Sequence, residues 1–143
     1  MALYKVELRG YRVSTTSIPE EGGIYVVYRC SHDKENHRVF LKEMIYIGRN
    51  KNNIKQDIQE KEPDFKQKKQ AEEEICYSFS IDTRDIDIKA RALIFMQKPI
   101  LNEESEKNNF GYTSSNFIIE GKNNLFKFKR FGITTKSKKD GRD

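Results

Sequence analysis

Two long apolar segments, separated by a short polar one, constrain the fold of this chain more than any other feature of its sequence. GGIYVVYRC (22–30) and VFLKEMIYIG (39–48) are rich in β-branched and aromatic residues, which are typical of buried strands. The segment between them, SHDKENHR (31–38), is polar throughout and short enough for a hairpin loop. We therefore predict an antiparallel pair of strands that carries Tyr25 on one strand and Tyr46 on the other.

Weaker patterns predict further strands around this hairpin. Apolar and polar residues alternate at 3–13, at 75–81 and at 125–133, where the pattern suggests an edge strand. Together with the hairpin these segments predict an α+β fold, in which a small antiparallel sheet with a three-stranded core is flanked by helices.

The helices are predicted from spacing and from residues that stop a helix. Ile54 and Ile58 share one helical face, and we expect Pro63 to end that helix. A charge-dense segment at 65–74 is predicted to be a solvated helix, and an apolar stripe predicts another helix from about Asp85 to Gln97.

Length and composition favour one small domain. A chain of 143 residues can bury a core without disulfide bonds, although 34% of its residues are charged and only 36% are hydrophobic. Cys30 and Cys76 lack the spacing of a metal site, so we expect buried free thiols. No secretory signal and no apolar run of about 18 residues is present, so we expect a cytoplasmic protein without a membrane partner.

The positive charge of the chain is concentrated at one end. Residues 124–143 account for the formal net charge of +5, whereas acidic and basic residues balance in the rest of the chain. A neutral body with a basic tail suits salt-sensitive contact with nucleic-acid phosphates. A tail that only keeps the protein in solution explains the same pattern, and both readings stay open.

Four short motifs, taken in order, resemble one enzyme family. Gly23-Ile24-Tyr25 and Tyr46-Ile47-Gly48 are followed by GRNKNNI (48–54) and LIFMQKPILN (93–102). This arrangement resembles the GIY-YIG nuclease superfamily, whose members are metal-dependent phosphodiesterases that cut DNA. The resemblance implies three parts: an N-terminal strand and connector (1–21), a GIY-YIG-like core (22–104) and an extension with a basic tail (105–143).

The resemblance also implies roles for individual residues. Tyr25 matches the tyrosine that helps to deprotonate the attacking water, and Tyr46 matches the one that hydrogen-bonds phosphate or water. Asn102 matches an asparagine that holds the site together or contacts the phosphate. Gly48 is expected to let the chain leave its strand sharply. Because an ordinary phenol has a pKa of about 10, the role of Tyr25 requires a nearby metal ion or cation. The simpler alternative for each tyrosine is a ring that packs in the core.

Two positions depart from the family pattern. Asp57 stands where the family has its catalytic arginine, and Ala90 stands where it has its metal-binding glutamate. An alanine cannot bind a metal ion, and a carboxylate repels the scissile phosphate. At about 4 Å that repulsion reaches about 4 kcal/mol for an effective dielectric constant of about 20. The sequence therefore predicts a site that has lost efficient cleavage.

Three functions remain open at this stage. The leading hypothesis is a catalytically degenerate GIY-YIG nuclease-like domain that binds DNA or a DNA-processing partner. In it Tyr25, Tyr46, Arg49 and Asn102 face a phosphate. The candidate DNA-binding residues are Lys51, Lys55, Lys127, Lys129, Arg130, Lys136, Lys138 and Lys139. The second hypothesis is an active endonuclease that uses Mg²⁺ or Mn²⁺ with relocated ligands, Asp87 among them. The third is a module that binds only proteins.

Overall fold

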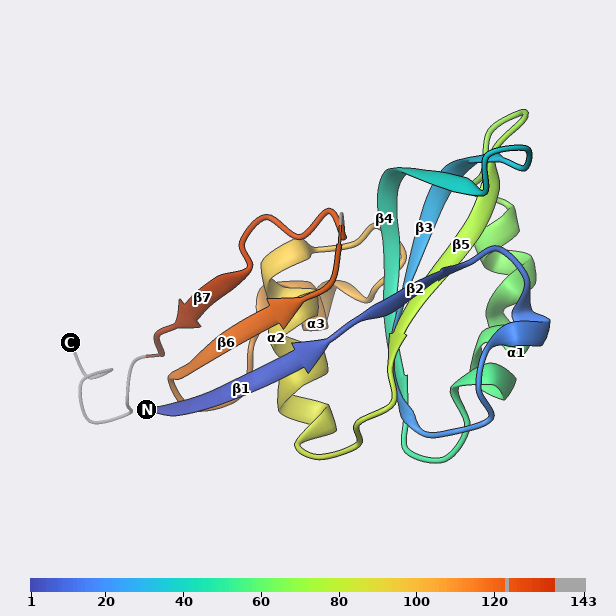
Figure 1. The fold of residues 1–143 in the computed structure, drawn as a ribbon. Helices are drawn as coiled ribbons and strands as arrows, with labels where there is room; N and C mark the ends of the chain where they lie inside the picture. Colours follow the sequence, from blue (N-terminus) through green and yellow to red (C-terminus); the bar gives the residue numbers. More distant parts are fainter. Residues whose placement is uncertain (123, 136–143) are drawn as a thin grey trace.

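The predicted hairpin lies inside a four-stranded sheet of this computed structural model, which describes residues 1–122 and 124–135 (Figure 1). Strand β3 (Gly23–Asp33) pairs antiparallel with β4 (Arg38–Asn50) on one side and with β5 (Glu74–Ser80) on the other. Strand β2 (Arg9–Arg12) adds an edge, which gives the order β2-β5-β3-β4. The predicted antiparallel core of three strands is therefore confirmed, with one further strand beside it.

A second sheet joins the two ends of the described chain. Strand β1 (Ala2–Glu7) pairs parallel with β6 (Ser115–Glu120), and β7 (Arg130–Ile133) pairs antiparallel with β6 as an edge strand. The edge strand expected within 125–133 is thus present but shorter, and β6 was not anticipated.

The single strand predicted at 3–13 is wrong. The chain passes from one sheet to the other at Leu8, whose N–H donates to the carbonyl of Glu120 at 2.8 Å, and β1 and β2 belong to different sheets (Figure 1). Alternation of apolar residues continues through both strands, so the local pattern does not reveal that the pairing partner changes.

Helices flank the four-stranded sheet on both faces, as the α+β class predicts. Helix α1 (Ile54–Lys66) packs with the cluster that contains Tyr25 and Tyr77, after the short 3₁₀ helix η1 (Thr15–Ser17). Helix α2 (Ile86–Gln97) lies between the two sheets and packs with Val26. A short helix, α3 (Glu104–Asn108), lies against α2.

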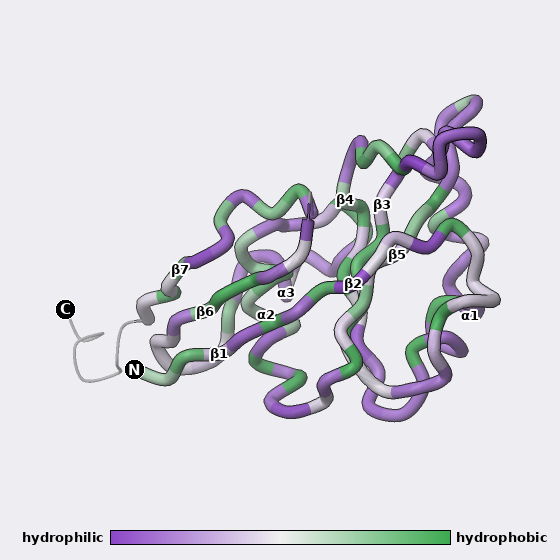
Figure 2. The backbone as a smooth tube through the Cα atoms, viewed as in Figure 1, coloured by the Kyte–Doolittle hydropathy of each residue, from purple (hydrophilic) through white to green (hydrophobic). Residues whose placement is uncertain are grey.

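Two predictions about the region around α1 are wrong. Pro63 lies inside this helix rather than at its end. The final turn persists because Phe65 is buried, with its ring centroid 5.3 Å from that of Tyr46 and 6.3 Å from that of Tyr77. Beyond Lys66 the predicted helix at 65–74 is replaced by turns, since this stretch has no apolar face to bury. Figure 2 shows that the loop between α1 and β5 is mostly hydrophilic.

Helix α2 agrees closely with its predicted bounds, and both cysteines are buried free thiols on neighbouring strands, as expected. None of the helices within the described residues has both the length and the apolar composition of a membrane span.

Candidate functional site

Tyr25 lies in the middle of the α1 face of the sheet. Its side chain is fully buried, because alternation along β3 turns Tyr25 and Val27 toward α1 while Val26 faces α2. Gly48 is its partner on β4, and a Cβ atom added to Gly48 would overlap the Tyr25 ring. The expected reason for this glycine is therefore wrong. Strand β4 continues to Asn50, and the glycine makes room for the tyrosine.

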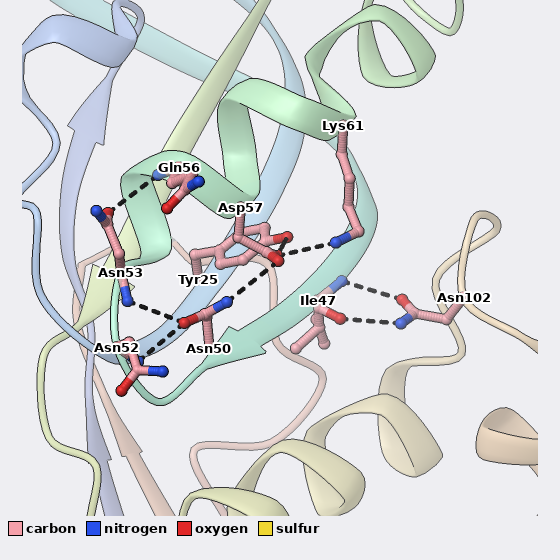
Figure 3. Close-up of polar contacts among 9 residues, drawn as sticks. All are labelled: Tyr25, Ile47, Asn50, Asn52, Asn53, Gln56, Asp57, Lys61 and Asn102. Atoms are coloured by element: carbon pink, nitrogen blue, oxygen red, sulfur yellow. Dashed lines mark hydrogen bonds and ion pairs between the residues drawn. The ribbon is translucent and has the colours of Figure 1, made fainter.

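The Tyr25 hydroxyl is held by Asp57, the residue at the position where the sequence resemblance implied an arginine. It donates a hydrogen bond to Asp57 Oδ2 at 2.5 Å (Figure 3). Lys61 Nζ reaches the same oxygen at 3.0 Å, and Asn50 Nδ2 donates to Asp57 Oδ1 at 3.4 Å. Only 14% of the Asp57 side chain is exposed, so these contacts form a partly buried network.

Local sequence explains how Asp57 reaches this place. Asn53 caps α1 by accepting a hydrogen bond from the N–H of Gln56 at 3.0 Å, which fixes the start of the helix (Figure 3). Asn50 Oδ1 accepts from the N–H groups of Asn52 and Asn53 at 2.8 and 2.9 Å. The asparagine-rich segment after β4 is therefore a structured turn that presents the first turn of α1, with Asp57, to the Tyr25 hydroxyl.

Both motif tyrosines have raised pKa values. Burial and then the hydrogen bond to Asp57 raise the pKa of Tyr25 far above that of an ordinary phenol. Burial also raises the pKa of Tyr46, whose ring centroid lies 6.0 Å from that of Tyr25. A phenol that donates to a carboxylate keeps its proton at neutral pH, so in this arrangement Tyr25 does not act as a base.

Asn102 binds the backbone of the YIG motif. Its Oδ1 accepts from the N–H of Ile47 at 3.0 Å, and its Nδ2 donates to the carbonyl of Ile47 at 2.9 Å (Figure 3). The side chain is buried, and the neighbouring Leu101 N–H donates to the Ile45 carbonyl at 3.0 Å. Asn102 thus acts as a strand partner for the free edge of β4, and both polar groups of its amide are used in doing so.

Arg49 and Asp87 contact one another away from Tyr25. Arg49 Nε donates to Asp87 Oδ1 at 2.9 Å, and Arg49 Nη1 lies 3.5 Å from Glu106 Oε2. Lys51 Nζ lies 3.9 Å from Asp87 Oδ2. Asp87, the carboxylate predicted as a relocated metal ligand, is therefore ion-paired. Within residues 1–122 and 124–135, no group of three or more His, Cys, Asp or Glu side chains is placed to hold a metal ion.

Ala90 is separated from the Tyr25 network. It is fully buried in the apolar cluster of Val26, Ile47 and Leu93, which lies on the α2 face, whereas Tyr25 belongs to the cluster on the α1 face. The candidate residues therefore divide into two groups, with Tyr25, Tyr46 and Asp57 toward α1 and Ala90 toward α2.

The candidate DNA-binding lysines do not surround Asp57. Lys55 Nζ donates to the Thr16 carbonyl at 3.2 Å beside α1. Lys127, Lys129 and Arg130 are exposed just before and at the start of β7, and Figure 1 shows β7 far from α1. Lys136, Lys138 and Lys139 lie outside the described residues.

Sequence reasoning missed Lys61 as part of the site. Its spacing of four residues from Asp57 in a predicted helix was the available signal, because opposite charges at i and i+4 face one another. No protein-family model, curated protein or solved structure matches this chain.

Proposed function

We propose that this chain is a catalytically degenerate GIY-YIG nuclease-like domain that binds DNA without cutting it efficiently. The observation that carries the proposal is the hydrogen bond from Tyr25 to Asp57. This hydrogen bond occupies the hydroxyl that, in the proposed family, would activate water. Its acceptor is a carboxylate, at the position where the resemblance implies the cation that phosphodiester cleavage requires.

The charge balance around Tyr25 also supports loss of cleavage. Lys61 is the one cation in contact with Asp57 within the described part of the chain, and its charge offsets that carboxylate. The Tyr25 side chain is fully buried and its hydroxyl already donates to Asp57, so this hydroxyl is not available to a phosphate or to an attacking water. Phosphoryl oxygens in a cleavage transition state carry more negative charge than in the ground state, so this arrangement opposes the reaction.

The metal ion that the resemblance implies does not fit the residues present. A buried alanine stands at the glutamate position, and the Asp87 carboxylate faces Arg49 and Lys51. The proposal therefore contains no metal-dependent step, and the family's Mg²⁺ or Mn²⁺ belongs only to the alternative of an active enzyme.

DNA contact is supported by the basic C-terminal part. The net charge of the chain is concentrated in residues 124–143, and Lys127, Lys129 and Arg130 are exposed. Each lysine or arginine that neutralises a phosphate releases a counterion, so binding through this segment weakens as salt increases.

The test pairs a cleavage assay with a binding assay. Supercoiled plasmid is incubated with Mg²⁺ or Mn²⁺ and the native protein, Tyr25→Phe, Asp57→Arg or Asp57→Arg/Ala90→Glu. We expect no nicking by the native protein. Nicking that Tyr25→Phe abolishes would overturn the proposal in favour of an active endonuclease. Because Ala90 is fully buried, the folding of the double variant is checked by its circular dichroism and thermal melting.

Binding is measured by fluorescence anisotropy of a labelled DNA duplex at 50 and 200 mM salt. We expect Lys127→Gln/Lys129→Gln/Arg130→Gln to bind more weakly and to lose part of the salt dependence. The matched control is Lys66→Gln/Lys68→Gln/Lys69→Gln, which removes three lysines near the end of α1. Absence of DNA binding by the native protein at low salt would leave a protein-binding module as the better description.

A further inference from the structure

A cavity of about 320 Å³ opens between β1, the end of β5 and the start of α2, and none of the candidate site residues lines it. This volume is at the lower end of the range of ligand pockets, about 300–1,000 Å³. Its wall contains apolar side chains, four cations and three carboxylates, those of Glu7, Asp82 and Asp85. The residues on which the argument depends are Leu3, Arg9, Ile81, Arg84, Asp85 and Lys89.

Lys89 is the most informative of these residues. Its side chain is only 7% exposed, and it lies beside Ala90 on the core face of α2. No hydrogen-bond acceptor for its ammonium group is found within the described part of the chain. The nearby carboxylate of Asp82 is 3.6 Å away, and Arg84 already donates to both oxygens of that carboxylate, at 3.0 and 2.8 Å. An ammonium group has three donors, so this buried lysine keeps hydrogen-bonding capacity for a ligand.

The N-terminus of α2 is a second feature that favours a bound anion at this cavity. Lys89 is in the first turn of the helix, where side chains point back toward the N-terminus and the helix dipole is positive. Asp85, the N-cap residue, has φ of 53° and makes no capping hydrogen bond with its side chain. A lysine at this end of a helix is electrostatically unfavourable. Asp82 at 3.6 Å offsets part of that cost but is shared with Arg84, so a bound anion would offset it further.

The remaining charges around the cavity are nearly balanced by neighbours. Lys5 lies 3.2 Å from Glu7, and Arg84 is paired with Asp82. Arg9 is exposed at the cavity and has no ion-pair partner among the described residues, and Lys89 shares the carboxylate of Asp82 with Arg84. Four cations therefore face the three carboxylates of Glu7, Asp82 and Asp85. Leu3 and Ile81 are 57% and 40% exposed, so apolar surface lies next to these cations.

We propose that this cavity binds a nucleoside monophosphate, either free or at the 5′ end of a DNA strand. The phosphate accepts hydrogen bonds from Lys89 and Arg9, and the base covers Leu3 and Ile81. The inference rests on the buried lysine and its cavity. It holds whether or not the Tyr25 region contacts DNA.

The test is calorimetric titration of the full chain with deoxyadenosine monophosphate, deoxyadenosine and inorganic phosphate. We expect the monophosphate to bind more tightly than either of its parts. Lys89→Met, which keeps the length of the side chain, should weaken binding at least about 10-fold, because hydrogen bonds between charged groups are the strong ones. Arg9→Gln should weaken it less, since this side chain is exposed.

Two variants serve as matched controls. Lys107→Met removes another buried lysine, one that is ion-paired with Glu104 at 3.0 Å, and Arg38→Gln removes an exposed arginine from β4. Both should bind the monophosphate as the native protein does. Lys89→Met should melt close to the native temperature, because Asp82, which lies 3.6 Å from Lys89, keeps both hydrogen bonds from the Arg84 guanidinium. Lys107→Met should melt below the native temperature, because it breaks the closer ion pair with Glu104.

Absence of saturable binding by the native protein at millimolar monophosphate would overturn the proposal, as would equal binding by native protein and Lys89→Met. If Lys89→Met does not fold, the exposed Arg9→Gln decides the outcome by the same comparison with Arg38→Gln. Competition by 5′-phosphorylated and 5′-hydroxyl oligonucleotides shows whether the bound monophosphate is a free nucleotide or the 5′ end of a DNA strand. Stronger competition by the phosphorylated strand indicates a DNA end, and competition by neither indicates a free nucleotide.

Discussion

The Tyr25 hydroxyl donates to the carboxylate of Asp57, a residue 32 positions later in the chain, at 2.5 Å. This contact links the centre of β3 to the first turn of α1. Lys61 and Asn50 complete the surroundings of the same carboxylate. Asp57 therefore has a structural role that does not depend on any reaction.

Replacing Asp57 by alanine should destabilise the fold. The change leaves a buried phenol without an acceptor and removes the partner of Lys61, which together should lower the free energy of unfolding by about 2 kcal/mol. Urea denaturation followed by circular dichroism measures this difference. Asp64→Ala, at an exposed position of the same helix, is the control. Equal stability of the two variants would show that the Asp57 contact contributes little.

Stability should fall steeply at alkaline pH. Burial raises the pKa of Tyr25 above its unfolded value of about 10 and raises the pKa of Tyr11 to about 12. A raised folded-state pKa means that the unfolded chain loses its proton first. The stabilisation is therefore complete below about pH 10 and decreases above it. Urea midpoints at pH 9 and pH 11 test this, and Tyr25→Phe should show a smaller decrease than the native protein. Tyr112→Phe, at an exposed position, should behave like the native protein.

Gly48 should not tolerate a side chain while Tyr25 is present. A methyl group at this position overlaps the tyrosine ring, and such overpacking typically costs about 1–3 kcal/mol. We expect Gly48→Ala to lower the thermal melting temperature. Tyr25→Leu should be less damaging in the Gly48→Ala background than in the native one, because the smaller side chain leaves room for the methyl group. Purely additive effects in this double-mutant cycle would contradict the packing explanation.

Asn102 should be required for the integrity of β4. Asn102→Ala removes the donor and the acceptor that bind the Ile47 backbone, so we expect a loss of about 2 kcal/mol and faster hydrogen exchange of the Ile47 amide. Asn109→Ala, at an exposed position, is the matched control. An unchanged exchange rate at Ile47 in Asn102→Ala would argue against the strand-partner role.

The parts of the fold that depend on local patterns were predictable. The β3–β4 hairpin follows from two β-rich segments around a polar loop, and α2 follows from its apolar stripe. The continuation of α1 through Pro63 was not predictable locally, because it depends on Phe65 fitting between Tyr46 and Tyr77. The second sheet was missed for a similar reason, since β1 pairs with a strand more than one hundred residues away.

The candidate site was predictable only in part. Placing Tyr25 and Tyr46 on paired strands required no more than the hairpin. The contact between Tyr25 and Asp57 depends on where the asparagine-rich turn places α1. The spacing of apolar residues in the sequence does not predict that placement. Lys89 was not predicted as a site residue. A lysine next to an apolar stripe is normally solvated, and the sequence does not show that this side chain is buried.

The parallel pairing of β1 with β6 has a consequence for how the chain folds. Residues 9–80 contain all the strands of the four-stranded sheet, so that sheet forms through contacts of short and moderate sequence separation. The contact between Ala2 and Ser115 instead closes nearly the whole described chain into a loop. Closing so long a loop is entropically expensive, and it becomes favourable only after the intervening residues are ordered. During synthesis, β1 is therefore made before every strand of the four-stranded sheet, yet it cannot pair until β6 has been made.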